Sequence, residues 1–176
     1  MPVVNRTRTA LSDEELLNTL RDAYYAEFGV PIHRARMATL WSVLAFEHGA
    51  GADPVPEGRR AAWKLWNWNW GNRRGIEGDA GYYMMSAIEH VDGERKSIVG
   101  RWPAYSSHEV GMRTWLRMMS TRYRAAWVAS LSGNAMSYSL AAKAGGYFTA
   151  PVLGPKGYAN GVRTWMKIFF KRWPPS

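Results

Sequence analysis

The chain contains no cysteine and no long apolar run. Without cysteine, disulfide frameworks and thiolate metal sites are excluded, while the redox compartment is left open. No apolar stretch approaches the roughly 20 residues that a membrane-spanning helix needs. Residues 1–9 also lack the apolar core of a signal peptide. We therefore expect the protein either to stay in the cytoplasm or to leave it by a route that this chain does not encode.

Acidic residues are scarce relative to basic ones. Lys and Arg total 23 and Asp and Glu total 14, so the net charge is +9. This excess favours polyanionic partners such as nucleic acid, anionic lipid or acidic cell-wall polymer. The ten tryptophans are typical either of core packing or of a groove whose rings face sugars, nucleobases or lipid headgroups.

Motifs that identify several other enzyme classes are missing. The four histidines are scattered, and Glu47-His48 lacks the rest of a zincin motif, so we expect no metal site. There is no Gly-rich phosphate-binding loop and no nucleophile elbow of the G-x-S-x-G kind. We therefore expect no bound cofactor.

Hydrophobic periodicity predicts a mostly helical α+β domain with one inserted β-hairpin. A capping box at Ser12–Glu15 begins a helix that ends at Gly29, and a largely apolar helix follows over about 31–46. Alternation from about Tyr82 to Tyr105 predicts a hairpin that turns at Asp92-Gly93. Further helices are predicted at 59–66, 106–119 (with a capping box at 106–109), 122–131, 134–144 and 157–171. We expect residues 1–176 to form a single domain with a flexible N-terminus at 1–11.

Glu47 is the first candidate for chemistry, because it closes the apolar helix directly after Leu44-Ala45-Phe46. A carboxylate is rarely placed at the end of a buried helix without a partner. Desolvation there would raise its pKa and let it act as a general acid near neutral pH. The alternative is a solvated helix end, although a negative charge at a C-terminus opposes the helix dipole.

Glu89 is the second candidate, although polar residues near a hairpin tip are usually only solvated. Cleavage of a glycosidic bond needs an acid for the leaving oxygen and a second group that activates water or stabilises the cation. A helix-end Glu47 that faces Glu89 across a cleft meets this requirement. Spacing in the sequence does not by itself bring the two together.

Several segments match, in order, the pattern of one known family. The first matching segments are Leu44–Gly51 around the candidate acid, Asn69-Trp70-Gly71-Asn72, and Glu89 before Asp92-Gly93. The later matching segments are Arg101–Ser107, Arg122–Ala126, Gly146–Pro151 and Tyr158-Ala159. In this order the chain resembles the bacterial glucosaminidases, family 73 of the glycoside hydrolases, whose flagellar members bore through peptidoglycan.

This resemblance implies a lysozyme-like fold in which the hairpin forms one wall of a cleft. It also implies an endo-β-N-acetylglucosaminidase that hydrolyses β-1,4 bonds of peptidoglycan glycan strands. By position, Glu47 becomes the general acid, Glu89 the second catalytic carboxylate, and Tyr147 a catalytic-assistance or substrate-positioning residue. Substrate contacts are then expected from Trp68, Asn69, Trp70, Asn72, Tyr105 and Thr149.

The chain departs from the family pattern in three places. Ala150 replaces an Asp, about five extra residues (152–157) precede Tyr158, and His48-Gly49-Ala50-Gly51 replaces Ser-Gly-Trp-Gly. A lytic transglycosylase, which needs only one catalytic Glu, and a muramidase are therefore alternatives on the same substrate. Two alternatives are not enzymes: a basic nucleic-acid-binding module and a wall-binding protein without catalytic activity.

The partners that we expect follow from this interpretation. The main partner is peptidoglycan; no specific nucleic acid is expected, and the protein is expected to be a monomer. The cationic and aromatic segment Trp165–Trp173 forms either a surface for anionic membrane or lipopolysaccharide or a last core helix with a solvated basic edge. We expect action in the periplasm or cell wall after release from the host cytoplasm by a lysis system, or on a virion, as for a bacteriolytic, antimicrobial phage endolysin.

Overall fold

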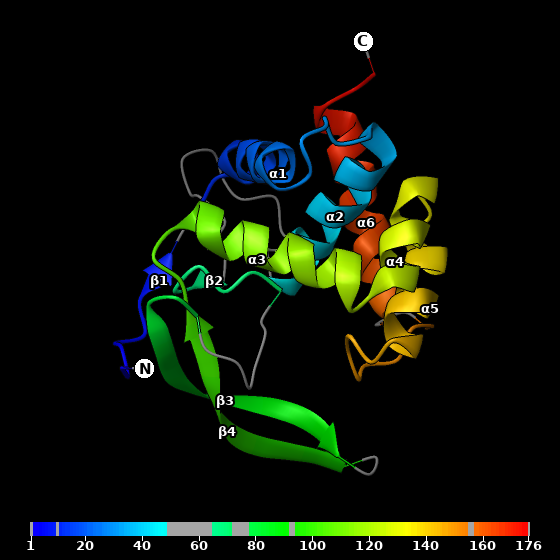
Figure 1. Cartoon of the computed structure of the whole chain (residues 1–176). Helices are drawn as coiled ribbons and strands as arrows, with labels where there is room; N and C mark the ends of the chain where they lie inside the picture. The colour runs from blue at the N-terminus through cyan, green and yellow to red at the C-terminus, as the bar shows by residue number, and fades with distance from the viewer. Residues whose placement is uncertain are drawn as a thin grey trace, which may run out of the picture.

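The computed structural model describes residues 2–9, 11–48, 65–71, 78–91, 94–154 and 157–175. The helices pack into one body, and a long two-stranded hairpin extends away from it (Figure 1). This arrangement confirms the mostly helical α+β fold with one hairpin between helices.

The first helix begins and ends where its sequence signals predict. α1 (Asp13–Phe28) is opened by a capping box, in which the Ser12 side chain accepts from the Glu15 N–H at 3.2 Å. In return, the Ser12 N–H donates to Glu15 Oε2 at 2.7 Å. The helix stops at Gly29, whose φ of 70° lies in the left-handed region that glycine adopts readily.

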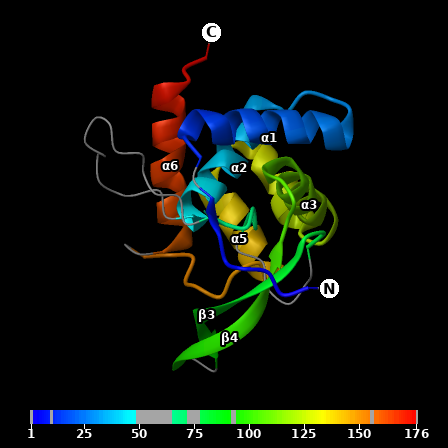
Figure 2. The same ribbon diagram turned by 90° about the vertical axis from the view of Figure 1, so that its left-hand side faces the viewer.

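The second helix runs through the centre of the body. α2 (Arg34–Glu47) starts later than expected because the His33 side chain caps it, accepting from the Ala35 N–H at 3.3 Å. Every residue over 38–45 is buried, as expected for a helix that is apolar on most faces. α2 packs against α6 (Tyr158–Arg172), and Figure 2 shows the two side by side beneath α1.

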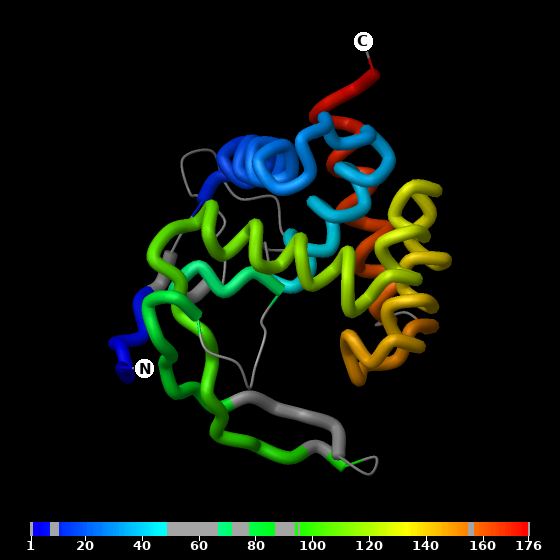
Figure 3. The backbone as a smooth tube through the Cα atoms, viewed as in Figure 1, coloured from blue at the N-terminus to red at the C-terminus, as the bar shows by residue number. Residues whose placement is uncertain are grey.

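The hairpin has the predicted position and turn. β3 (Gly81–Val91) and β4 (Glu94–Ala104) pair antiparallel over their full length, as the tube in Figure 3 shows. Val91 lies opposite Glu94, so only residues 92 and 93 connect the strands. At the base of the hairpin, Tyr83 and Trp102 are paired and buried, and with Ala104 they form a small second core.

The N-terminal segment lies against the base of this hairpin. The Val4 N–H donates to the Tyr82 carbonyl at 2.8 Å, and β1 (Arg8–Thr9) pairs with β2 (Leu65–Trp66). For residues 2–9 the structure thus shows backbone pairing where the sequence suggested flexibility. The strand at 65–66 also corrects the end of the helix predicted over 59–66, because these two residues are extended; residues 59–64 lie outside the described residues.

The C-terminal part of the chain supplies the remaining helices, in the segments where the sequence predicts them. They are α3 (His108–Thr121), α4 (Arg124–Ala129), α5 (Ala135–Ala144) and α6, with a 3-10 turn η1 (Ser130–Ser132) after α4. The start of α3 differs in one respect from the prediction. Ser107 caps it, accepting from the Val110 N–H at 3.3 Å, so Glu109 stands one position too early to complete a capping box.

Tryptophan and a buried arginine hold the helices to one another. Trp41 of α2 lies edge-on to Trp165 and Trp173, with ring centroids 5.9 Å and 5.2 Å away. The buried Arg36 guanidinium donates to Ser130 Oγ and to the Tyr24 hydroxyl, both at 3.0 Å.

Among the helices of the described ranges, none has the length and apolar character needed to cross a membrane.

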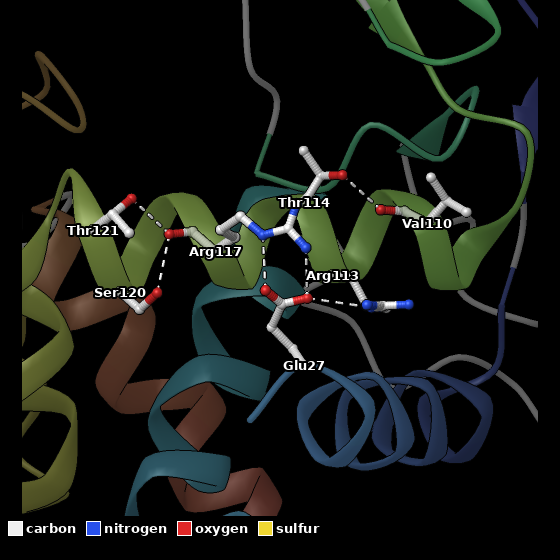
Figure 4. Close-up of polar contacts among 7 residues, drawn as sticks. All are labelled: Glu27, Val110, Arg113, Thr114, Arg117, Ser120 and Thr121. Atoms are coloured by element: carbon white, nitrogen blue, oxygen red, sulfur yellow. Dashed lines mark hydrogen bonds and ion pairs between the residues drawn. The ribbon is translucent and has the colours of Figure 1, made fainter. Parts of the chain in front are cut away.

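An ion-pair cluster fastens α1 to α3 (Figure 4). Glu27 accepts from Arg117 Nε at 2.7 Å and Nη2 at 2.8 Å, and from Arg113 Nε at 3.2 Å. The Glu27 side chain is only 11% exposed, whereas the two arginines are about half exposed. The hydrogen bonds from Arg117 are the main reason that the pKa of Glu27 is lowered from its usual 4.5.

Because the folded-state pKa of Glu27 is lowered, its contribution to stability is present above the unfolded value of 4.5 and is lost as the pH falls through the folded value. We expect Glu27→Gln to reduce the free energy of unfolding by about 1 kcal/mol near neutral pH. In acid the variant and the wild type should converge. Urea unfolding at several pH values measures this, with Asp22→Asn, at an exposed pair with Arg21, as control. A difference that does not depend on pH would contradict the assignment.

Candidate active site

Glu47 is the last residue of α2, so the buried helix carries its carboxyl to the edge of the core. Its side chain is partly buried, and the next residue, His48, is fully buried and caps the helix with its N–H on the Leu44 carbonyl at 3.0 Å. In both views the C-terminal end of α2 lies on the side of the body from which the hairpin extends (Figures 1 and 2). The position of the carboxyl is therefore fixed by the packing of α2.

Tyr158, the first residue of α6, holds this carboxyl. Its hydroxyl donates to Glu47 Oε1 at 2.6 Å, a length typical of a charge-assisted bond. The Tyr158 ring is stacked on Phe148 at 3.7 Å between centroids and lies edge-on to Phe46 at 5.0 Å. Burial, followed by the nearby charge of Glu47, raises the pKa of Tyr158 well above 10.0, so the hydroxyl stays a proton donor.

Two more tyrosines lie within electrostatic reach of Glu47, the fully buried Tyr138 and the partly buried Tyr147. Burial and then the Glu47 charge raise the pKa of Tyr147 well above its ordinary value, and that of Tyr138 in the same way. The Tyr147 hydroxyl accepts from Trp115 Nε1 at 3.1 Å. Glu47 is thus surrounded by neutral hydroxyl groups from α5, α6 and the segment between them, an environment suited to a carboxyl that exchanges a proton.

The segment Asn69-Trp70-Gly71 packs directly against this group. The Gly71 N–H donates to His48 Nε2 at 3.3 Å, which requires that nitrogen to be unprotonated. Gly71 has a φ of 72°, and a Cβ there would lie 2.4 Å from Trp115 Nε1 and 2.7 Å from the Tyr147 hydroxyl. Only glycine satisfies both the backbone conformation and the close approach.

Trp70 and Asn69 face inward in the described structure. Trp70 is 1% exposed and donates through Nε1 to the His108 carbonyl at 3.0 Å. Asn69 is also 1% exposed, and its amide donates to the Tyr83 hydroxyl at 3.5 Å. These contacts hold the segment between α2, α3 and the hairpin. Direct contact of either side chain with a substrate stays a prediction.

The other predicted site residues are spread more widely. Trp68 is partly buried and lies edge-on to His108 at 5.5 Å, whereas Tyr105 is buried at the foot of the hairpin. Thr149 is exposed, and its carbonyl accepts from Lys143. Asn72 lies outside the described residues.

Glu89 lies on β3, opposite Lys96 in the register. Its side chain is outside the described part of the structure, so its relation to Glu47 stays a prediction. The hairpin as a whole extends away from the helical body (Figure 1).

Sequence reasoning gave Tyr158 no role beyond its place in a Tyr-Ala match. The hydrogen-bond partner Tyr158 lies 111 positions from Glu47 in the chain, where periodicity gives no sign of it. The only signal that the sequence gives at this position is an aromatic residue at the start of an amphipathic helix.

Within the described ranges, no group of three His, Cys, Asp or Glu residues is placed to hold a metal ion.

Comparison with known proteins completes this description. No family model and no curated protein matches the chain. A mutant of the peptidoglycan hydrolase from Sphingomonas sp. A1 superposes with a TM-score of 0.60 at 20% identity, over 87% of this chain and 89% of that one. The chain has the fold of these hydrolases.

Two further structures agree on the fold. The catalytic domain of the autolysin Auto from Listeria monocytogenes gives a TM-score of 0.55 at 14% identity, over 93% of this chain and 87% of that one. A C-terminally truncated glycoside hydrolase domain of FlgJ from Salmonella typhimurium gives 0.50 at 16% identity, over 92% and 99%. The lysozyme-like architecture is thus shared along almost the whole chain.

The Tyr158 hydroxyl stabilises the charged form of Glu47, so its removal should raise the pKa of Glu47. We expect Tyr158→Phe to shift the titration of the Glu47 side-chain carboxyl, followed by carbon NMR, to higher pH. Tyr138→Phe is the matched control, because the buried Tyr138 hydroxyl has no hydrogen-bond partner among the described residues. Equal shifts in the two variants would contradict the assignment of this bond.

Proposed function

We propose that this chain hydrolyses the glycan strands of peptidoglycan, with Glu47 as the general acid. The observation that carries the proposal is the Tyr158–Glu47 hydrogen bond of 2.6 Å at the end of a buried helix. It occurs in a fold shared with solved structures described as peptidoglycan hydrolases. A carboxyl held in this way suits protonation of a glycosidic oxygen as the bond to the leaving sugar breaks.

The surroundings of Glu47 support this role. Tyr158 fixes one carboxyl oxygen, and the hydroxyl of Tyr147 lies in the same buried group. Hydroxyl donors of this kind orient a carboxyl while stabilising its charged form less than a salt bridge does. Tyr147 then acts as a positioning residue for the acid or the sugar, as the family resemblance implies.

Glu89 is the proposed second carboxylate, placed on the hairpin to activate water or to stabilise the oxocarbenium ion. In this mechanism the linkage cut is the β-1,4 bond on the reducing side of N-acetylglucosamine. A lytic transglycosylase reaction, in which the muramyl 6-hydroxyl attacks in place of water, needs no second carboxylate. Full activity of Glu89→Gln would favour that chemistry.

We further propose that the enzyme acts in the periplasm or cell wall as a bacteriolytic endolysin. The excess positive charge of +9 supports this proposal, because the wall is anionic and attracts a basic enzyme at low ionic strength. A monomeric state belongs to the same proposal. Anionic membrane or lipopolysaccharide is the alternative partner for the basic edge of the C-terminal helix, whose apolar face is buried in the core.

Mass spectrometry of the fragments released from purified sacculi tests this function. Fragments that end in reducing N-acetylglucosamine, released by the wild type and absent with Glu47→Gln, are the expected result. The variant should stay folded because it keeps the shape of the side chain, and Glu109→Gln, at an exposed residue of α3, serves as control. Anhydro-muramyl ends would indicate a lytic transglycosylase, and reducing N-acetylmuramic acid ends a muramidase. Fragments released equally by Glu47→Gln would overturn the assignment of the acid.

A further inference from the structure

The positive charge of the chain is concentrated in its C-terminal part. Residues 110–176 contain ten Lys and Arg but no Asp or Glu. Three of these cations are neutralised by carboxylates of α1: Arg113 and Arg117 by Glu27, and Arg172 by Asp13. The remaining cations of this region have no carboxylate partner within the described residues. Their positive charge is therefore not offset by a neighbouring carboxylate.

The outer face of α6 carries a row of these cations. Arg163, Lys167 and Lys171 recur every four residues, so they lie on one helix face, and all three are exposed. At 1.5 Å per residue the row is about 12 Å long. The same helix supplies Tyr158 to Glu47 at its N-terminal end, and Arg163 follows five residues later along it.

A hollow of about 150 Å³ opens at the start of this row. It is lined by Arg163 and Asn160 of α6, by Met136 of α5 and by the segment 152–154. This segment belongs to the insertion of 152–157 that departs from the family pattern.

The dimensions and chemistry of the hollow limit what it accepts. It is smaller than the roughly 300–1,000 Å³ of pockets that bind drug-sized ligands, so it suits one terminal group rather than a disaccharide. A guanidinium beside apolar walls fits a carboxylate on a short aliphatic chain. Lipid is a poorer fit, because the apolar face of α6 (Val162, Met166 and Phe169) is already buried in the core.

We propose that the hollow at Arg163 and the row Arg163, Lys167 and Lys171 bind the acidic peptide stems that the glycan strands carry. This proposal rests on the proposed function and adds to it a substrate class: strands that bear peptides rather than bare glycan. Arg163 takes a stem carboxylate in the hollow, and the two lysines attract further carboxylates along the strand. The stem is thereby fixed on the helix that also holds Glu47.

Cleavage of strands with and without peptides tests the proposal. Initial rates are measured at low salt on peptide-bearing strands and on strands stripped of their stems by an amidase. Arg163→Gln should raise KM roughly two- to fivefold on the peptide-bearing strands, with kcat unchanged, and should leave cleavage of bare strands as it is. The triple variant Arg163→Gln, Lys167→Gln and Lys171→Gln should also weaken the salt dependence. Arg124→Gln, which removes an exposed cation of α4, should match the wild type.

A binding measurement separates this proposal from the proposed catalysis. Sedimentation of Glu47→Gln with peptide-bearing strands should be weakened by adding Arg163→Gln and unaffected by adding Arg124→Gln, even where no strand is cut. Equal effects of Arg163→Gln on peptide-bearing and bare strands would overturn the proposal. The proposal would also be overturned if Arg163→Gln left binding to peptide-bearing strands unchanged but abolished binding to anionic vesicles. In that case the row would bind lipid phosphate.

Discussion

The hydrogen bond from Tyr158 to Glu47 joins the C-terminal end of α2 to the N-terminal end of α6. Both helices are fixed by the core: α2 is buried over 38–45, and α6 packs on it through Trp165 and Phe169, which both contact Trp41. Because two helices anchored in the core meet at this bond, the carboxyl has little freedom to turn. A general acid must be held in one position and one orientation, and the fold holds the Glu47 carboxyl in this way.

A second set of contacts fastens the loop before the hairpin to the same point. His48, next to Glu47 in the chain, accepts from Gly71, and Gly71 is pressed against Trp115 and Tyr147. A side chain at position 71 would therefore collide with Trp115 and Tyr147. This packing explains why the Asn-aromatic-Gly stretch matters even though Asn69 and Trp70 are buried.

Much of the fold follows from local signals in the sequence. The capping box at Ser12 and the two-residue turn after Val91 are short-range features, and both occur where predicted. The strand at Leu65–Trp66 was missed because it exists only through pairing with Arg8–Thr9, far away in the chain. For the same reason Tyr158 had no predicted role. Glu47 was predicted as the candidate acid because an apolar helix that ends in a carboxylate is a local anomaly, whereas its contact with Tyr158 is set by tertiary packing.

The most direct test of this account is a crystal structure of Glu47→Gln with a peptidoglycan-derived oligosaccharide bound. The account predicts a glycosidic oxygen within hydrogen-bonding distance of the amide at position 47, with the Tyr158 hydroxyl still in contact with that side chain. An oligosaccharide bound elsewhere, with no glycosidic oxygen near position 47, would contradict the central role assigned to Glu47.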